Sequence, residues 1–399
     1  MRKINRRGAV TLAMAAATQT SFSAEGFEIA FRAAAKRHNI PAAVALVVDP
    51  EKPLLQSSHG NRDSQSSVPV DGRTIFAIAS MTKAITSTAA LQLVEQGALD
   101  LDEQVHKHLP ELRDLPLLEG FDAAGAPRFA KERYQVTLRQ LLTHTAGFAY
   151  SWNHELVLRY GSPANPIPYL VNKPGTRWHY GTNVDWIGKL VETVSRKTLE
   201  AYFQERIFQP LGMSDTSFLL PPKKLDRLSS SYQRDAHGVL QESPRIQPPV
   251  PASFNGGGGL FSTADDYAKF TQMILRRGLS ADRKRILQAS TVSAMSSNQV
   301  GGLDSGKIRS TMPERSSNVD LHPGESDRFG LGFLINPKAY DAGRSAGSLA
   351  WGGIRNTFYW IDPKRGIGAV IMMQFLPFCD DAAMGMLGDF ERSVYSHLT

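Results

Sequence analysis

Residues 75–85 read IFAIASMTKAI, so Ser80 and Lys83 stand three positions apart within an apolar run. A serine hydroxyl is a weak nucleophile at neutral pH and needs a nearby base. Positions i and i+3 share a helix face, so Lys83 can reach the Ser80 hydroxyl where a helix begins. Apolar neighbours favour burial, which makes a lysine a better base. The stretch predicts a serine nucleophile with a lysine base, although so short a pattern also arises by chance.

Two later segments carry residues suited to acyl chemistry. Tyr180 precedes a predicted helix that Asp185 would cap, and its hydroxyl could shuttle a proton. Trp351-Gly352-Gly353 precedes a predicted strand, and paired glycines let backbone approach a ligand closely. The N–H of Ile354, with that of Ser80 at a helix N-terminus, could then stabilise an oxyanion. Taken singly, a packed tyrosine and a hairpin turn explain these features equally well.

Strand patterns occur near both ends of the chain, and helical patterns dominate the middle. The expected strands are residues 41–49, 54–60, 330–335, 356–361 and 366–375. The expected helices are residues 25–39, 80–96 (capped by Gly97), 184–195, 199–208 and 380–397. Terminal strands that share a sheet would make the middle an insertion. We therefore predict an α+β fold, with a sheet domain of residues 25–98 and 231–399 and an inserted helical domain of residues 99–230.

Composition excludes several classes of protein. The chain has 399 residues, of which 42% are hydrophobic and 21% charged, as in an ordinary globular protein of two domains or one large domain. Its one cysteine, Cys379, excludes an internal disulfide and a zinc site built from cysteines. No apolar run reaches the roughly 18–20 residues that a membrane span needs.

The excess of positive charge belongs mainly to the N-terminal segment. The net charge is +7, but residues 1–24 hold four basic residues and no acidic one, which leaves 41 Lys+Arg against 38 Asp+Glu elsewhere. Nucleic-acid binding is therefore not indicated. The segment is basic, then apolar, then small and polar, which predicts a secretory signal peptide and a periplasmic or secreted protein. The alternative is a cytoplasmic protein that keeps this segment as an Ala-rich helix.

In chain order, Ser80-x-x-Lys83, Tyr180 and Trp351-Gly352-Gly353 resemble the motifs of the serine β-lactamase-like hydrolases. The chain is most similar to the family VIII carboxylesterases, relatives of class C β-lactamases and of penicillin-binding D-Ala-D-Ala peptidases. Residues 141–147 (LLTHTAG) and 255–270 (NGGGGLFSTADDYAKF) support the resemblance, which runs from residue 25 to the C-terminus. Residues 356–378 also resemble relatives that include the fungal statin-side-chain acyltransferases.

The resemblance implies a β-lactamase/transpeptidase-like fold, an antiparallel sheet flanked by helices with an inserted all-helical domain. It implies that Ser80 forms an acyl-enzyme, that Lys83 and Tyr180 share the acid and base work, and that the N–H groups of Ser80 and Ile354 form the oxyanion hole. No cofactor or metal is implied, and the expected partner is a small-molecule ester. The residues expected to contact it are Trp351, Gly352, Gly353, Tyr150, Trp152 and Thr182. For Tyr150 and Trp152, core packing is an equal alternative.

Two departures from the class C pattern bear on the substrate. Thr182 stands two residues after the tyrosine, where those enzymes carry asparagine, and Asn183 follows one position later. Trp351 stands where their third motif has a lysine that attracts the carboxylate of a β-lactam. Loss of one such charge-assisted contact weakens binding by about 10- to 150-fold. Both departures favour a neutral ester over a β-lactam.

Other motifs are given structural interpretations. Ser345 lies in a G-x-S-x-G match without the flanking strand and helix that this motif requires, so a loop is predicted. His106 and His108 have no third ligand nearby, and His144 is read as a hydrogen-bonding residue. Residues 255–259 (NGGGG) lack the ending of a phosphate loop, and residues 302–325 are read as a surface loop.

These observations predict a cofactor-free serine carboxylesterase acting on short- to medium-chain esters. One alternative is a β-lactamase or D-Ala-D-Ala carboxypeptidase that uses the same nucleophile. A second is an acyltransferase to a specific alcohol, and a third is a non-catalytic binding protein on the same scaffold. The sequence does not determine the oligomeric state.

Overall fold

A seven-stranded antiparallel sheet lies at the centre of the computed structural model, which describes residues 24–161, 168–243 and 245–397. The strand order is β2-β1-β13-β12-β11-β10-β9. Its strands are β1 (Ala42–Val48), β2 (Pro53–Gly60), β9 (Arg328–Phe329), β10 (Leu334–Ile335), β11 (Leu349–Gly353), β12 (Thr357–Asp362) and β13 (Ile367–Met372). Because β1 pairs with β13, both ends of the chain share one sheet, as predicted. The predicted signal segment lies outside the described residues, except for Ala24.

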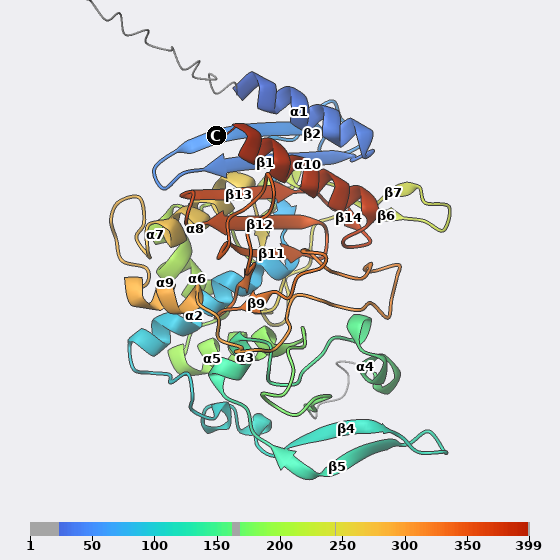
Figure 1. The fold of residues 1–399 in the computed structure, drawn as a ribbon, viewed down its shortest axis with the longest axis vertical. Coiled ribbons are helices and arrows are strands. Elements are labelled where there is room, and N and C mark those ends of the chain that lie inside the picture. The colour runs from blue at the N-terminus through green and yellow to red at the C-terminus, as the bar shows by residue number, and fades with distance from the viewer. Residues whose placement is uncertain (1–23, 162–167, 244, 398–399) are drawn as a thin grey trace, which may run out of the picture.

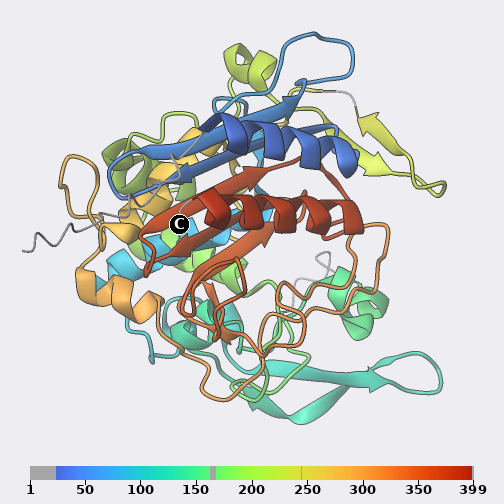
Figure 2. The same ribbon diagram turned by 45° about the horizontal axis from the view of Figure 1, so that its top comes forward.

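Helices cover both faces of this sheet (Figures 1 and 2). Helices α1 (Ala24–Arg37) and α10 (Asp381–His397) lie side by side, and Phe390 of α10 packs against Trp360 of β12. Tyr267 of helix α8 (Ala264–Leu275) packs against Tyr359, the residue directly before Trp360 in that strand. Successive side chains of a strand point to opposite faces, so α8 and α10 cover opposite sides. This explains why every residue of β1, β12 and β13 is buried.

Apart from β14, the remaining helices and strands lie in the chain between β2 and β9. The helices are α2 (Thr82–Glu95), α3 (Leu138–Leu142), α4 (Glu155–Tyr160), α5 (Asn183–Ser195), α6 (Leu199–Phe203), α7 (Gln209–Leu211) and α9 (Ala289–Met295). Small sheets pair β3 (Phe76–Ala77) with β8 (Phe261–Ser262), and β14 (Phe375–Leu376) with β6 (Ser231–Arg234) and β7 (Leu240–Ser243). Within the described residues, no helix has the length and apolar character that crossing a membrane requires.

The middle region is not all-helical, which corrects one expectation. Strands β4 (Leu115–Phe121) and β5 (Pro127–Tyr134) form a hairpin that extends away from the main sheet (Figure 1). Its turn has Gly125 at φ +83°, and the Asp122 carboxylate accepts backbone N–H bonds there. Charged, exposed residues fill most of β5, so this strand lacks the alternation that reveals a half-buried strand in a sequence. The predicted domain boundaries near residues 98 and 230 remain a prediction.

Other elements differ from the prediction in length. The strand expected at residues 330–335 is reduced to β10, because the backbone turns sharply at Gly332, with φ +100°. The helix expected from Ser80 starts as a short 3-10 helix, η1 (Ala79–Met81), and continues as α2. It ends at Glu95, and Gly97 follows two residues later with a φ of +69°, which fits the predicted cap.

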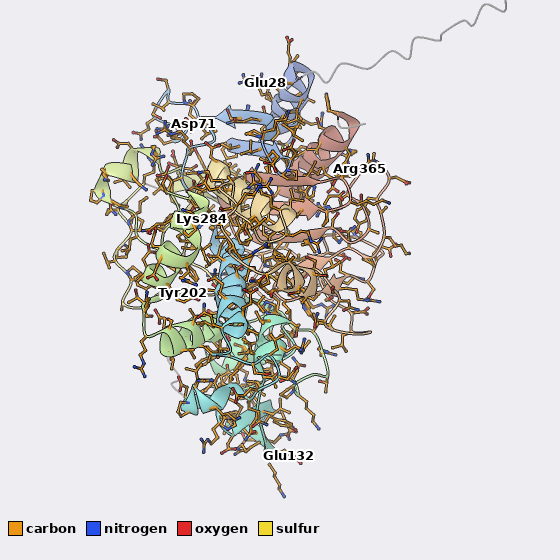
Figure 3. All side chains as sticks on the ribbon, turned by 90° about the vertical axis from the view of Figure 1, so that its left-hand side faces the viewer. Glu28, Asp71, Glu132, Tyr202, Lys284 and Arg365 are labelled. Carbon is orange, nitrogen blue, oxygen red and sulfur yellow. The ribbon has the colours of Figure 1, made fainter. Side chains whose placement is uncertain are left out.

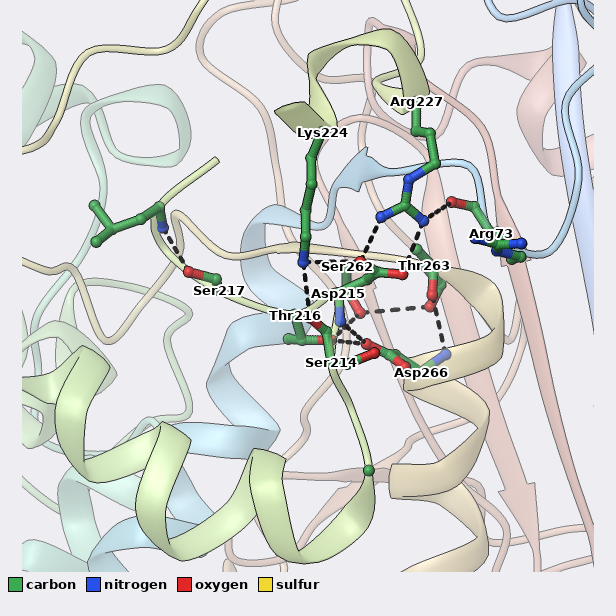
Figure 4. A network of polar contacts seen from close by, with 12 residues as sticks. Arg73, Ser214, Asp215, Thr216, Ser217, Lys224, Arg227, Ser262, Thr263 and Asp266 are labelled. Atoms are coloured by element: carbon green, nitrogen blue, oxygen red, sulfur yellow. Dashed lines mark hydrogen bonds and ion pairs between the residues drawn. The ribbon is translucent and has the colours of Figure 1, made fainter. Parts of the chain in front are cut away.

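A polar network ties the middle region to α8 (Figure 4). Asp215 pairs with Lys224 and Arg227, and the hydrogen bond from Arg227 is the main reason that the pKa of Asp215 lies well below its usual value. Asp266, in the first turn of α8, accepts from the backbone N–H of Asp215 and from the Thr216 hydroxyl. These bonds fix the start of α8, and α8 in turn holds the turn that contains Ser80: Tyr267 donates to the carbonyl of Met81 at 2.9 Å.

Candidate active site

Ser80 sits in the turn between β3 and α2, at the end of a buried apolar segment. The preceding residue, Ala79, has φ +43°, a conformation that non-glycine residues rarely adopt. Such strain is held only where the surroundings fix the backbone, and it is common at functional sites. The turn is fixed by the bond from Tyr267 to Met81 and by a 3.3 Å bond from the N–H of Leu260 to the Thr82 hydroxyl. The Ser80 side chain is thereby presented at the start of α2.

Lys83 is buried beside Ser80, with an exposed fraction of 3%. Its Nζ lies 3.1 Å from Ser80 Oγ, 3.1 Å from Tyr150 Oη and 2.6 Å from the carbonyl oxygen of Gly257. The Tyr150 hydroxyl also donates to Asp185 Oδ2 at 3.0 Å. The lysine predicted from the S-x-x-K spacing therefore reaches the serine, and a tyrosine and an aspartate continue the chain of contacts.

The hydrogen bonds that Lys83 makes to its other partners leave the lone pair of its amine free to face Ser80. The Gly257 carbonyl can only accept a hydrogen bond, and Tyr150 gives its own proton to Asp185, so both are acceptors for Lys83. Desolvation and then the Asp185 charge raise the pKa of Tyr150 well above its usual value, which keeps that proton on the phenol. A neutral Lys83 amine would keep two N–H bonds to these acceptors. Its lone pair would then face the Ser80 hydroxyl.

The glycines of residues 255–259 explain how the Gly257 carbonyl comes so close. A Cβ on Gly257 would lie 2.0 Å from Asp185 Oδ2, and one on Gly256 would lie 2.8 Å from Gly188 Cα of α5. Only residues without side chains allow this loop to pack on α5. The loop of residues 255–259 thus supplies a hydrogen-bond acceptor for Lys83.

Tyr180 lies on the other side of Lys83. Its ring centroid is 4.8 Å from Lys83 Nζ and 4.9 Å from the ring of Trp351. Its hydroxyl is buried and has no hydrogen-bond partner within the described residues. A buried hydroxyl normally finds a partner, so this group is available to a bound substrate. The backbone at Tyr180 is held by Asn153, whose side-chain amide donates to its carbonyl at 2.9 Å.

His144 packs behind Tyr180, with the two rings 4.9 Å apart. Its Nδ1 lies 2.9 Å from Asn183 Nδ2, an amide donor, so Nδ1 is the acceptor in this pair. Burial, followed by the charge of Lys83, lowers the pKa of His144 well below 6.5, which keeps the ring neutral. The geometry is consistent with the structural interpretation of His144.

Strand β11 brings the second predicted oxyanion donor to the nucleophile. Trp351, Gly352 and Gly353 lie within this strand rather than in a turn before β12. A Cβ on Gly353 would stand 2.2 Å from the carbonyl oxygen of Ile78, so glycine is needed for this close approach. Within the described residues, no hydrogen bond uses the N–H of Ser80 or of Ile354. Two free backbone donors near Ser80 suit an oxyanion.

An apolar cavity opens in front of Ser80. Residues 302–325, predicted as a surface loop, supply part of its wall, and Ile308 and Val319 of that segment are joined by two backbone bonds of 2.9 and 2.8 Å. Trp351, which the resemblance to the class C pattern aligns with a lysine, is one of the lining residues. The lining residues are Ser80, Trp152, Tyr180, Ile308, Val319, Leu321, Trp351, Gly352, Ile354 and Phe378. The apolar lining beside Ser80 suits an uncharged group better than a charged one.

Three residues expected to contact the substrate do not line this cavity. Tyr150 lies behind Lys83, with its ring stacked on Trp152 at 6.1 Å. Thr182 is the residue that precedes α5, and Gly353 packs against Ile78. Asp185, predicted as a helix cap, lies inside the first turn of α5 and accepts from Tyr150 instead.

The contacts that Asp185, Gly257 and Asn183 make in this site were not predicted from the sequence. A carboxylate and an amide within five residues after Tyr180 were a signal for the first and third. Ser345 is far from this chemistry: its N–H donates to Asp362, inside the sheet domain. The described residues contain no group of three or more His, Cys, Asp or Glu side chains arranged to hold a metal ion.

Comparison with known proteins finds matches that cover most of the chain. The family model described as beta-lactamase matches residues 27–386. The chain is 34% identical to monacolin J acid methylbutanoyltransferase from Aspergillus terreus, covering 92% of this chain and 95% of that protein. It is 30% identical to lovastatin esterase from Penicillium rubens, covering 80% and 85%. Unliganded simvastatin synthase from Aspergillus terreus has a similar structure, with a TM-score of 0.79 and 33% identity over 93% of this chain and 98% of that one.

Proposed function

Because this chain belongs to the beta-lactamase family and has its β-lactamase/transpeptidase-like fold, we propose that it is a serine carboxylesterase. It would cleave short- to medium-chain esters through an acyl-enzyme on Ser80. The observation that carries the proposal is the set of contacts around Lys83, which leaves its lone pair to the Ser80 hydroxyl. No cofactor enters this chemistry.

Acylation begins when Lys83 takes the proton of the Ser80 hydroxyl and Oγ attacks the ester carbonyl carbon. The carbonyl oxygen becomes an oxyanion, which the N–H groups of Ser80 and Ile354 would stabilise. The bond to the alcohol oxygen then breaks. The proton held by Lys83 returns to the leaving alkoxide through the Tyr180 hydroxyl, whose ring lies next to Lys83 Nζ.

Deacylation reverses these roles with water. A water molecule takes the place of the departed alcohol, and its oxygen attacks the acyl carbon while one proton passes through Tyr180 to Lys83. The same oxyanion donors act again. Lys83 then returns the proton to Ser80 Oγ as the bond to the acyl carbon breaks and the carboxylic acid leaves. Tyr150 and Asp185 hold Lys83 in place throughout, since both bonds are made in the resting site.

The apolar cavity supports an ester as the substrate rather than a β-lactam. Its wall carries Trp351 where a cation would attract the β-lactam carboxylate. Trp351 Nε1 is buried without a partner among the described residues, so it offers one neutral hydrogen-bond donor. We expect benzylpenicillin and nitrocefin to be poor substrates.

Acyl transfer to an alcohol is the second candidate function. It is favoured by the 34% identity to a methylbutanoyltransferase over 92% of the chain. The two functions share the acyl-enzyme on Ser80 and differ in whether water or an alcohol removes the acyl group. An alcohol bound beside Tyr180 would be deprotonated by the same residues.

One assay separates these functions. Hydrolysis of p-nitrophenyl acetate, butyrate and octanoate is compared with that of nitrocefin, using residues 25–399 and the Ser80→Ala variant. Fast ester cleavage that Ser80→Ala abolishes supports the esterase. Nitrocefin turnover that exceeds ester turnover contradicts it, and absence of any Ser80-dependent turnover would leave the non-catalytic alternative. Adding a series of alcohols then reports acyl transfer, as new ester formed per acid released.

A further inference from the structure

A second, larger cavity lies next to the catalytic one and has not been used by the chemistry above. Residues 176–180, before α5, form one wall, and residues 303–309 form the other. Tyr180 and Ile308 line both this cavity and the apolar cavity in front of Ser80. We call the second cavity the basic cleft, because Arg177, Lys307 and Arg309 line it.

The three cations of the basic cleft are not neutralised by the protein. Within the described residues, none of them forms an ion pair with an Asp or Glu. One carboxylate, Asp304, lines the cleft, and it is bonded to the Ser326 hydroxyl. His179 is neutral at pH 7, because burial, His154 and Arg177 lower its pKa to about 4. The cleft therefore carries a net positive charge.

Both walls of the cleft are held to the catalytic site by hydrogen bonds. Thr311, two residues after Arg309, bonds the carbonyls of Trp152 and Ser151 at 2.8 Å through its N–H and its hydroxyl. On the opposite wall, Asn153 bonds the carbonyl of Tyr180. The backbone next to the cations is thus tied to the catalytic site, and the cationic side chains themselves are exposed at the cleft.

We propose that the basic cleft binds a carboxylate or phosphate group on the alcohol side of the ester substrate. The proposal rests on the proposed function and extends it to the substrate class. The acyl side is assigned to the apolar cavity, where no charged residue is among the lining side chains. The leaving alcohol receives its proton from Tyr180, and Tyr180 also lines the basic cleft. Arginine and lysine bind both carboxylate and phosphate oxygens strongly.

The test compares two anionic esters with a neutral one, the carboxylate carrying one negative charge and the phosphate nearly two. The substrates are meta-carboxyphenyl butyrate, meta-phosphonooxyphenyl butyrate and the neutral meta-(methoxycarbonyl)phenyl butyrate. The test variant combines Arg177→Gln, Lys307→Gln and Arg309→Gln. We expect kcat/KM to fall by about 10- to 30-fold for one or both anionic esters, as for three exposed charge contacts acting together. The neutral ester should change by less than about 2-fold.

The matched control has the same change in net charge. It combines Lys284→Gln, Lys364→Gln and Arg365→Gln, all exposed residues that line neither cavity. Lys284 and Arg365 are labelled in Figure 3. If the control lost activity on the anionic esters to the same extent as the test variant, long-range attraction and not binding in the cleft would be responsible, and the proposal would be wrong.

A binding measurement separates this proposal from the proposed function. Titration calorimetry with Ser80→Ala measures, without turnover, the affinities for meta-carboxyphenyl butyrate and for the neutral meta-(methoxycarbonyl)phenyl butyrate. Tighter binding of the anionic ester that disappears with the three cleft substitutions supports the cleft even if no ester is hydrolysed by the wild type. Equal affinities for the two esters, or an equal loss of both in the cleft variant, would overturn it. The carboxyl and phosphoryl esters together identify which anion is preferred.

Discussion

The hydroxyl of Tyr150 lies 3.0 Å from the carboxylate of Asp185 and donates its proton to it. This bond turns the phenol oxygen into an acceptor for Lys83, so an aspartate in the first turn of α5 orients a lysine on α2. Neither Asp185 nor Tyr150 has to touch the substrate for this effect. The relationship gives the first prediction.

Asp185→Asn should lower kcat for p-nitrophenyl butyrate by about tenfold, with little change in KM, because the lysine is less well oriented. Tyr150→Phe should lower it further, since the phenol oxygen is lost. Steady-state kinetics at several pH values, with circular dichroism to verify the fold, provide the measurement. A purely structural role for Asp185 would instead change stability and leave the pH profile of kcat as in the wild type.

Lys83→Ala should reduce the rate of acylation by about 10²- to 10⁴-fold, the usual contribution of a general base. The measurement is the pre-steady-state burst of p-nitrophenol, which should vanish. Lys83→Arg serves as the charge-conserving comparison, since a guanidinium does not accept a proton at neutral pH. A normal burst in either variant would show that another group deprotonates Ser80.

Tyr180→Phe should have an effect that depends on the leaving group. A p-nitrophenolate leaves without a proton, whereas an alkoxide needs one. We expect kcat for ethyl butyrate to fall by about 10²-fold or more, and that for p-nitrophenyl butyrate to fall much less. Acid release from the ethyl ester and absorbance for the aryl ester give the two rates. Equal losses for both esters would contradict the assignment of Tyr180 as proton donor to the leaving group.

Gly353→Ala should destabilise the protein by about 1–3 kcal/mol, the usual cost of overpacking. Its Cβ would meet the Ile78 carbonyl oxygen at 2.2 Å and Thr357 Oγ1 at 2.4 Å, and moving β11 away would also displace Ile354. Urea unfolding and kcat measure the two effects. Gly302→Ala is the matched control, because no atom lies within 4 Å of its Cβ position, and it should behave as the wild type.

Stability should fall as the pH is lowered from about 7.5 to about 5, and His179 should account for part of the loss. Its folded pKa of about 4 lies below the ordinary value of 6.5, so the unfolded chain binds the extra proton first. Stability from this residue is therefore complete above about pH 6.5 and is lost by about 2 kcal/mol at pH 5, before any discount for solvent exposure. The pKa of His144 is also lowered by burial, so this residue likewise makes the free energy of unfolding fall as the pH is lowered. Urea unfolding of the wild type and of His179→Gln at both pH values measures the difference, which should be smaller in the variant.

The sequence by itself determined the elements whose signal is local. An apolar run such as residues 42–48 forms a buried strand wherever it lies, and the i, i+3 spacing of Ser80 and Lys83 brings them together on any helix. The antiparallel sheet shared by both chain ends was likewise predicted and is confirmed. Hairpin β4–β5 was not predicted, because strand β5 is charged and exposed and lacks a buried face of its own.

Tertiary structure decided which distant side chains complete the site. Lys83, Tyr150, Asp185 and Gly257 are separated by 35 to 174 positions, and no local periodicity links them. Their contacts depend on glycines that let the loop at residues 256–257 pack on α5, and that close approach is a property of packed surfaces. The same holds for the basic cleft, whose cations come from two segments more than a hundred residues apart. Local chemistry is set by neighbours in the chain, whereas long-range contacts are set by how the buried faces fit together.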